Sequence, residues 1–249
     1  MTLLATERIK LFTTRSPWWS MLLALGLSIG FAALIAANAT GGDSLSVDSA
    51  ESGYQFSLVV MMVMAALAVT TEYRFGTIRV TFQAVPNRVA LLLAKTTVVA
   101  VLAALIGEIA AFASWAVARM IHPNAGLALD NEQAWRNVAG MGLVYAITAV
   151  IAVAVGILVR QTAGAVAILL IYTLLVENLV VLIPKIGHTI QKWMPFTEAN
   201  NFLVAGSSDA GRRGIEAMPL GAWPSLLYFA GIAVVLMTIA LVTANRRDA

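Results

Sequence analysis

Two carboxylic acids and an amide fall inside long apolar stretches of the sequence, where polar side chains are rare. Glu108 lies in the stretch over residues 89–118, and Glu177 with its neighbour Asn178 lies in the stretch over residues 162–183. A charge at the centre of a bilayer costs about 2.5–3.5 kcal/mol on insertion scales. Such a carboxyl therefore needs a partner, a water-filled cavity or a proton. Two roles remain open: a hydrogen bond between helices, or proton transfer in a secondary transporter.

Other kinds of chemistry find no support in the sequence. It contains no G-x-x-x-x-G-K-[ST] phosphate loop, and no lysine follows a glycine. There is no H-E-x-x-H motif and no cysteine. The two histidines, His122 and His188, stand alone in connecting segments, whereas a metal site needs several converging ligands. We therefore expect no catalytic site, no metal site and no ATP site in this chain.

A basic, amphipathic segment follows the second apolar stretch and reads T-E-Y-R-F-G-T-I-R-V-T-F-Q-A-V-P-N-R over residues 71–88. Arg74 and Arg79 lie off its apolar stripe. Pro86 is expected to end the helix. An amphipathic helix of this kind either lies on anionic lipid headgroups or docks into a groove on a cytoplasmic partner. Its apolar side chains recur three or four residues apart, as on one face of a helix: Phe75, Ile78, Phe82 and Val85.

The composition shows which kind of protein must position these residues. Hydrophobic residues make up 60% of the 249 residues and charged residues only 12%, whereas soluble domains carry roughly 25% charged residues. This predicts a membrane protein surrounded by lipid. The net charge of +3 does not indicate a nucleic-acid partner, because the basic residues form short clusters beside the apolar stretches.

Six apolar stretches are long enough to cross a membrane, which takes about 20 helical residues. Ten Lys and Arg residues fall on the side of both termini and six on the opposite side. The positive-inside rule therefore places both termini in the cytoplasm, as an even number of spans also requires. The sequence predicts an all-α polytopic fold with spans over residues 18–39, 54–70, 89–118, 138–159, 162–183 and 223–244.

The connections on the outer side differ in character. Residues 40–53 are rich in Gly, Ser and Asp, which predicts a flexible loop. Residues 184–222 carry three prolines and many apolar residues, which predicts short helices that dip into the outer interface. On the inner side, little more than Arg160 and Gln161 joins the fourth span to the fifth.

The hexapeptide Glu72-Tyr73-Arg74-Phe75-Gly76-Thr77, directly after the second span, resembles the E-x-x-x-G-T signature of ATP-binding-cassette type-two (ABC-2) exporter permeases. Residues 7–18 are similar to the elbow helix of that family, and the arrangement of spans and connections also matches. The resemblance implies one transmembrane permease domain over residues 1–249. Within it, residues 1–17 would form the elbow helix, residues 71–88 the cytoplasmic coupling helix, and residues 184–222 an outer segment with re-entrant helices.

The resemblance also implies a function. A permease of this family works in the inner (plasma) membrane with a second permease copy or a paralogue. Separate cytoplasmic ATPase subunits bind ATP and Mg²⁺. The cargo would be drug-, antibiotic-, peptide- or lipid-like. The resemblance assigns the coupling to the ATPase to eight residues of the inner segment: Glu72, Arg74, Phe75, Gly76, Thr77, Ile78, Arg79 and Phe82.

Physical reasoning gives two of these residues a role. Gly76 permits a close backbone approach or a bend where the chain leaves the membrane. Glu72 would accept hydrogen bonds from an arginine of a partner, or favour the N-terminus of its own helix.

Three other functions stay open at the level of the sequence. A proton-coupled secondary transporter would use Glu108 and Glu177, and loss of an ATPase would not affect it. An intramembrane enzyme would need a group of polar residues at matched depth, which the spans lack. A membrane anchor would tether an ATPase without moving any cargo.

Overall fold

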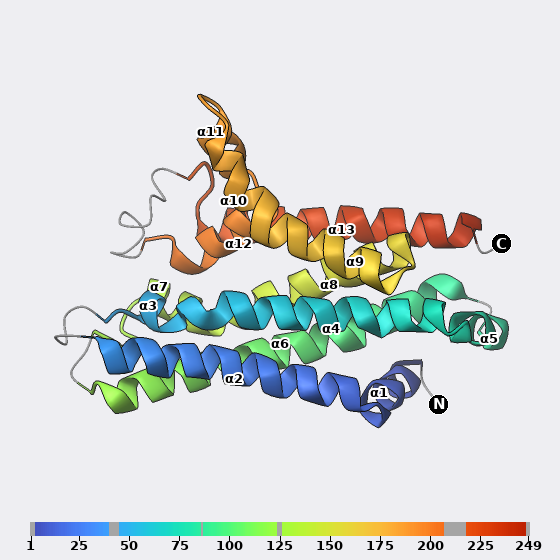
Figure 1. Ribbon diagram of the computed structural model, residues 1–249, viewed down its shortest axis with the longest axis horizontal. Helices are drawn as coiled ribbons and strands as arrows, with labels where there is room; N and C mark the ends of the chain where they lie inside the picture. Colours follow the sequence, from blue (N-terminus) through green and yellow to red (C-terminus); the bar gives the residue numbers. More distant parts are fainter. Residues whose placement is uncertain (1–2, 40–44, 86, 124–125, 207–217, 248–249) are drawn as a thin grey trace.

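The computed structural model describes residues 3–39, 45–85, 87–123, 126–206 and 218–247. Six long apolar helical runs cross it, which confirms an all-α polytopic membrane fold (Figure 1). Within the described residues, the only β pairing is an isolated bridge between Ser46 and Gly126. The six runs are α2 (Arg15–Asn38), α4 (Tyr54–Arg74), α6 (Arg88–Ile121), α8 (Met141–Val159), α9 to η4 (Thr162–Leu182) and α13 (Ala222–Arg247).

The predicted spans agree with these helices to within four residues at each end. The largest difference is in the second span, where α4 continues through the polar residues 71–74. In the fourth span the difference has a different origin, because residues 138–139 belong to the separate helix α7 (Glu132–Ala139). The fifth span is one helical run that changes type along its length: α9 (Thr162–Leu170), the π-helix η3 (Ile171–Val176), α10 (Glu177–Leu179) and the 3₁₀-helix η4 (Val180–Leu182).

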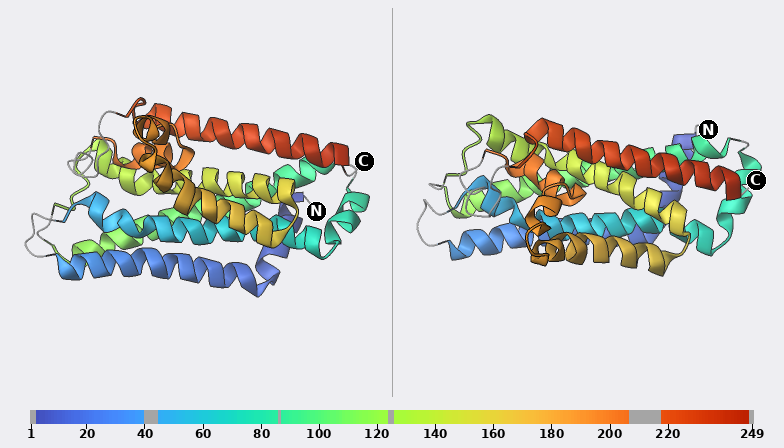
Figure 2. Two further views of the ribbon diagram at one scale, coloured as in Figure 1. Left: turned by 45° about the horizontal axis from the view of Figure 1, so that its top comes forward. Right: turned by 90° about the horizontal axis from the view of Figure 1, so that it is seen from above.

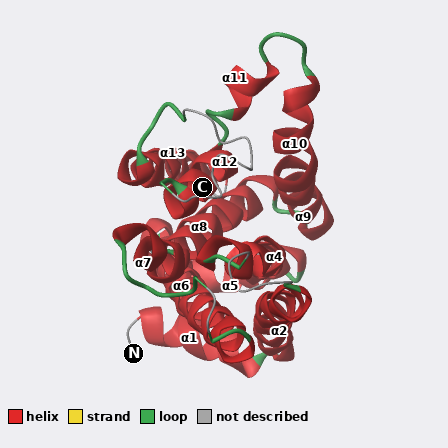
Figure 3. Cartoon of the chain, turned by 90° about the vertical axis from the view of Figure 1, so that its left-hand side faces the viewer, coloured by secondary structure: helices red, strands yellow, loops and turns green. Residues whose placement is uncertain are grey.

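Helix α8 lies at the centre of the bundle and packs against α4, α6 and α13 (Figure 3). Small residues make this packing close. A Cβ atom at Gly107 of α6 would lie only 2.6 Å from Cγ of Tyr145. Glycine at this position therefore leaves room for the fully buried ring of Tyr145 on α8. Helix α2 packs against α4 and α6 on the side away from α13.

The two ends of the bundle carry different short helices (Figures 1 and 2). Both chain termini, α1 (Leu3–Thr13) and α5 (Thr77–Ala84) lie at one end, here called the terminal end. The opposite end, here called the distal end, carries α3 (Val47–Ala50), α7 and α12 (Pro195–Val204). The short helix α11 (Gly187–Gln191) projects from the bundle beside α10.

The prediction of a flexible loop over residues 40–53 is wrong for the second half of that segment. Residues 47–53 form α3 and the 3₁₀-helix η2 (Glu51–Gly53), and residues 40–44 lie outside the described part of the chain. The Ser46 hydroxyl accepts a bond from the Ser49 amide at 3.2 Å, and the Ser49 hydroxyl accepts one from the Ser46 amide at 2.9 Å. The serines thus form a capping box and start a buried turn of helix.

The segments implied by the resemblance correspond to shorter helices. The elbow segment 1–17 contains α1, and its last residues already begin α2. The coupling segment 71–88 contains the end of α4, all of α5 and the first residue of α6. The outer segment 184–222 contains α11 and α12, while residues 207–217 lie outside the described part.

Candidate functional site

The motif at the terminal end bends the chain sharply. Helix α4 ends at Arg74, and α5 begins at Thr77. Between them, Gly76 has φ +71° and ψ 2°, the left-handed conformation that suits glycine. A Cβ atom there would meet nothing within 4 Å. Of the two roles predicted for Gly76, the structure therefore supports the bend, and no described residue makes a close approach.

The apolar face predicted for this segment is only partly formed. Ile78 is 4% exposed, and Phe82 packs against the hydrophobic core. The guanidinium of Arg88 lies 5.4 Å from the centre of the Phe82 ring, a cation–π contact between α5 and α6. Phe75 does not join this face, because it precedes the bend and is 71% exposed.

Several other residues at and after the bend are exposed. We call Arg74, Phe75, Gly76, Thr77 and Val80 the exposed face, because each is solvent-accessible at the terminal end. Val80 is 67% exposed and was not among the residues assigned from the sequence. Val80 lies off the predicted apolar stripe. That position in the sequence already indicated that its side chain would face away from the core. The side chain of Arg79 lies outside the described residues.

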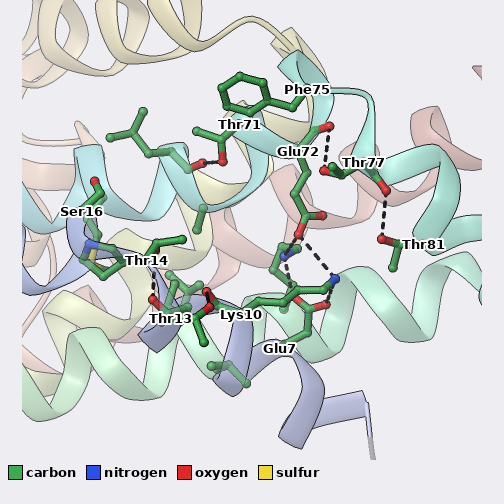
Figure 4. Close-up of a pocket in the computed structure, with 18 residues that line it drawn as sticks. Glu7, Lys10, Thr13, Thr14, Ser16, Thr71, Glu72, Phe75, Thr77 and Thr81 are labelled. Carbon is green, nitrogen blue, oxygen red and sulfur yellow. Dashed lines mark hydrogen bonds and ion pairs between the residues drawn. The ribbon is translucent and has the colours of Figure 1, made fainter.

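Glu72 points inward, into a network of four charged side chains from three helices (Figure 4). Lys95 Nζ of α6 lies 2.9 Å from Glu72 Oε1 and also binds a carboxylate oxygen of Glu7. Lys10 Nζ lies 2.8 Å from Glu7 Oε1 and 3.6 Å from Glu72 Oε1. This ion network joins α1, the end of α4 and the start of α6.

Two of the four side chains in the network are buried, and its charges balance. The side chains of Glu7 and Lys95 are 3% and 6% exposed. Burial alone would raise the pKa of Glu7, but Lys95 and Lys10 outweigh it and hold that pKa below its ordinary value. Burial would likewise lower the pKa of Lys10, but Glu7 and Glu72 raise it. Both pKa shifts favour the charged forms of Glu7 and Lys10, and removing one partner from a buried pair would leave an uncompensated charge.

Three members of this network, Glu7, Lys10 and Lys95, were missed as site residues in the sequence. Lys95 carried a usable signal, because it lies inside the third predicted span, where a cation needs a partner. Glu7 and Lys10 gave no comparable signal in the sequence, because charged residues are common in segments outside the spans. Their role depends on the packing of α1 against α6.

A cavity of about 500 Å³ lies beside the network, between α1, the start of α2, α4, α5 and α6. Glu7, Lys10, Glu72 and Lys95 all contribute to its wall. Figure 4 shows Glu72 reaching from α4 towards Glu7 and Lys10 on α1.

The family model for ABC-2 family transporter proteins matches residues 3–176, which include α1, the bend at Gly76, α5 and the whole ion network. The chain belongs to the ABC-2 transporter family. It is therefore a multi-pass membrane protein and a permease component. No curated protein matches the chain.

At the distal end of this permease component, Glu177 has several partners. Its carboxylate accepts hydrogen bonds from the amide of Phe196 at 3.0 Å, the amide of Thr197 at 2.9 Å and the hydroxyl of Thr197 at 3.1 Å. These donors are at the N-terminus of α12, where a negative charge is favourable. The buried Glu177 side chain therefore links the fifth span to α12.

Arg136 of α7 binds the other end of the same helix. Its Nε donates to the carbonyl of Phe202 at 2.6 Å, and its Nη2 also donates to the carbonyl of Ala205. A cation at a helix C-terminus complements the helix dipole. Helix α12 is thus held by the carboxyl group of Glu177 at its N-terminus and by the guanidinium of Arg136 at its C-terminus.

The other two intramembrane polar residues lie apart from these contacts. Glu108 of α6 packs against α8, where a Cβ at Gly142 would lie 3.0 Å from Glu108 Cγ. Asn178 is exposed and donates to the carbonyl of Leu174 in its own helix at 3.0 Å. A distal cavity of about 320 Å³ is lined by Glu177 and Asn178 but not by Glu108. In the part of the chain that the structure describes, no His, Asp and Glu side chains gather in a group of three that could hold a metal.

Proposed function

We propose that the chain is the translocation subunit of an ATP-driven exporter. It works with cytoplasmic ATPase subunits and with a second permease copy or a paralogue. The observation that carries this function is the exposed face at the bend. Phe75 and Val80 are large apolar side chains at the terminal end and are 71% and 67% exposed, more than the exposed apolar side chains of α1. A helix that docks into a groove on a partner presents such anchors.

The ion network supplies a route from this face to the spans. Phe75 lies three residues after Glu72, and Glu72 is paired with Lys95 of α6. On the other side of α5, the Asn87 side chain accepts a bond from the Ala90 amide at 3.0 Å and caps α6. A push on α5 would therefore move α4, α6 and α1 together. Closure of the ATPase subunits would rock these helices between inward- and outward-facing states.

The remaining features of the assignment follow from the sequence. Since the chain has no phosphate loop, ATP and Mg²⁺ would bind to the partner ATPase. The excess of Lys and Arg would place the terminal end in the cytoplasm and the protein in the plasma membrane. The apolar spans favour a drug-, antibiotic-, peptide- or lipid-like cargo.

Affinity purification from the native membrane tests the partnership. The unchanged chain should co-elute with a stoichiometric ATPase activity. The double variant Phe75→Ser with Val80→Asp should lose about tenfold or more of this activity while remaining monodisperse, because both anchors are truncated. Trp135→Ser, which removes a half-exposed aromatic residue at the distal end, is the matched control and should keep it. A folded chain that elutes without ATPase activity would contradict the assignment.

Transport in vesicles separates the exporter from the other functions. Cargo should move with ATP and should continue when an ionophore collapses the proton gradient. Glu108→Gln should then leave the rate unchanged. Transport that follows the proton gradient and stops in Glu108→Gln would instead establish a secondary transporter. An ATPase complex that moves none of the four cargo classes would point to a membrane anchor.

A further inference from the structure

The turn between α8 and α9 holds one residue in a strained conformation. Arg160 ends α8 with φ 59° and ψ 2°, in the left-handed region, and its amide donates to the carbonyl of Gly156 at 2.9 Å. Glycine is the usual residue in this conformation after a helix, because a side chain strains the backbone there. Such strain persists only where the surrounding structure holds the residue in place. The contacts of the Arg160 side chain therefore show what holds this turn.

The Arg160 side chain reaches the motif that follows the second span. Its guanidinium carbon lies 5.1 Å from the centre of the Tyr73 ring, a cation–π contact. Tyr73 lies near the end of α4, is partly buried and packs against the hydrophobic core. It occupies a variable position of the E-x-x-x-G-T signature and was not among the coupling residues that the resemblance assigned. The contact thus joins the motif to the turn between the fourth and fifth spans.

Close packing one turn earlier holds α4 and α8 against each other. A Cβ atom at Gly156 of α8 would lie 2.5 Å from Cγ1 of Val69 on α4, and Val69 is completely buried. Val69 precedes Tyr73 by four residues, and Gly156 precedes Arg160 by four, about one helical turn in each case. The Tyr73–Arg160 contact therefore continues this interface towards the terminal end. A displacement of Tyr73 would move the turn as well, because the two helices are already in contact.

Glu72 and Tyr73 are neighbours in the sequence but contact different parts of the bundle. Glu72 binds Lys95 on α6 and Lys10 on α1, whereas Tyr73 contacts Arg160. Successive residues of a helix point about 100° apart, so one turn of α4 can make both contacts. The fifth span begins two residues after Arg160. The second contact therefore reaches helices that the ion network does not include.

We propose that Arg160 is a positioning residue for transport, a role that rests on the proposed exporter function. Through Tyr73, it passes movement of the coupling motif to the turn between α8 and α9 and so to the fifth span. The left-handed backbone of Arg160 sets the direction in which α9 leaves α8, and its guanidinium ties that direction to Tyr73. The ion network moves α1 and α6, while this contact moves α8 and α9.

Hydrogen exchange of the full chain in nanodiscs, without an ATPase, tests the contact itself. Tyr73→Leu removes the aromatic face but keeps an apolar side chain. It should speed exchange at the Ala165 amide, in the first turn of α9, about threefold, as expected for the loss of a cation–π contact. Tyr73→Phe keeps the ring and should exchange like the unchanged chain.

Variants of Arg160 complete this test. Arg160→Asn removes the cation but tolerates the left-handed conformation, so it should resemble Tyr73→Leu. Arg160→Lys keeps a cation and should restore slow exchange. The double variant Tyr73→Leu with Arg160→Asn should exchange no faster than either single variant, because both remove the same contact.

Closure of the ATPase tests transmission without knowledge of the cargo. The co-eluting complex is compared before and after trapping with ATP and vanadate, again by hydrogen exchange. In the unchanged chain, trapping should alter exchange both in residues 77–84 and at Ala165. In Arg160→Asn the change in residues 77–84 should remain, because the exposed face is intact, whereas the change at Ala165 should shrink about threefold. Gln161→Ala alters the exposed next residue, is the matched control and should keep both changes.

The outcomes separate this role from the function on which it rests. If no ATPase co-elutes with the unchanged chain, the exporter function fails, and the role of Arg160 in transport fails with it. If trapping alters Ala165 equally in Arg160→Asn and in the unchanged chain, the exporter function stands and the role of Arg160 is overturned. Equal exchange in Tyr73→Leu and Tyr73→Phe would overturn it with or without an ATPase.

Discussion

At the scale of single residues, Lys95 is the member of the ion network on which the other charges depend. It is buried and contacts both Glu7 and Glu72. Replacement by methionine leaves the two carboxylates with only the half-exposed Lys10. We expect Lys95→Met to destabilise the protein by about 3 kcal/mol, because a buried charge without its partner is costly. Thermal unfolding in detergent, followed by loss of monodispersity, measures the effect.

The double variant Lys95→Met with Glu7→Gln is the control for this prediction. It restores equal numbers of positive and negative charges, with Lys10 facing Glu72. Much of the lost stability should return. If Lys95→Met alone is as stable as the unchanged chain, the network contributes nothing measurable.

The pKa of Glu7 predicts how the stability of the folded protein depends on pH. Its pKa in the folded protein lies below the ordinary value of 4.5, because Lys95 and Lys10 outweigh the effect of burial. The stability that the carboxylate contributes is therefore fully present above pH 4.5 and is lost as the pH falls through the lower, folded pKa. The difference in unfolding temperature between the unchanged chain and Glu7→Gln should be constant from neutral pH to about pH 5 and should close at lower pH. A difference that widens on acidification would show the opposite shift.

The same residues show where reasoning from the sequence ends. The motif around Glu72 was found, but Glu72 was expected to meet a partner or its own helix. Within this chain it meets Lys95 and Lys10, and the contact with a partner stays a prediction. Residues 7, 72 and 95 are far apart in sequence, so only the packing of α1 and α4 on α6 brings their charges together. Helical periodicity describes one element and contains no information on such pairings.

At the scale of elements, Gly76 determines how α5 leaves α4. A residue other than glycine in the left-handed conformation costs roughly 1–2 kcal/mol, and here no neighbour adds a steric clash. Gly76→Ala should therefore speed amide hydrogen exchange in residues 77–84 by about fivefold or more. Gly76→Asn should exchange nearly as slowly as the unchanged chain, because asparagine tolerates this conformation better. Equal exchange in both variants would show that backbone strain is not the cause.

A second prediction at the scale of elements concerns the stability of α12. Glu177→Ala removes the acceptor of three hydrogen bonds at its N-terminus. Hydrogen exchange should accelerate first at Phe196 and Thr197 and then along residues 195–204. Arg136→Ala should instead loosen the C-terminal end of the helix, near Phe202. Unchanged exchange at Phe196 and Thr197 in Glu177→Ala would mean that the carboxylate does not hold α12.

The sequence predicted well those elements that a single strong pattern locates, and predicted poorly those that lack one. Hydropathy alone locates a span, because every backbone group in lipid must be bonded within its own helix. The distal helices lack such a signal. The serines of α3 were interpreted as loop residues, although the same residue types form a capping box. Helix α12 was expected only as a short interfacial helix, since the charges that bind its ends come from the fifth span and from α7.

At the scale of the whole molecule, six spans require both termini on one side, and the structure shows them at one end (Figure 1). Which side of the membrane this end faces depends on the distribution of Lys and Arg. Because the sequence contains no cysteine, single cysteines can report it without a background. Gln83 is exposed at the terminal end, and Met120 is 80% exposed at the distal end.

In intact cells, a membrane-impermeant maleimide should label Met120→Cys but not Gln83→Cys. Permeabilised cells should show both, because the positive-inside rule places the terminal end in the cytoplasm. Trp135→Cys, at the distal end on α7, should behave like Met120→Cys. The reverse pattern would place α5 outside the cell, where no ATP-driven subunit could reach its exposed face. The labelling therefore bears on the orientation and on the exporter function together, and only a cytoplasmic α5 is compatible with an ATPase docked at Phe75 and Val80.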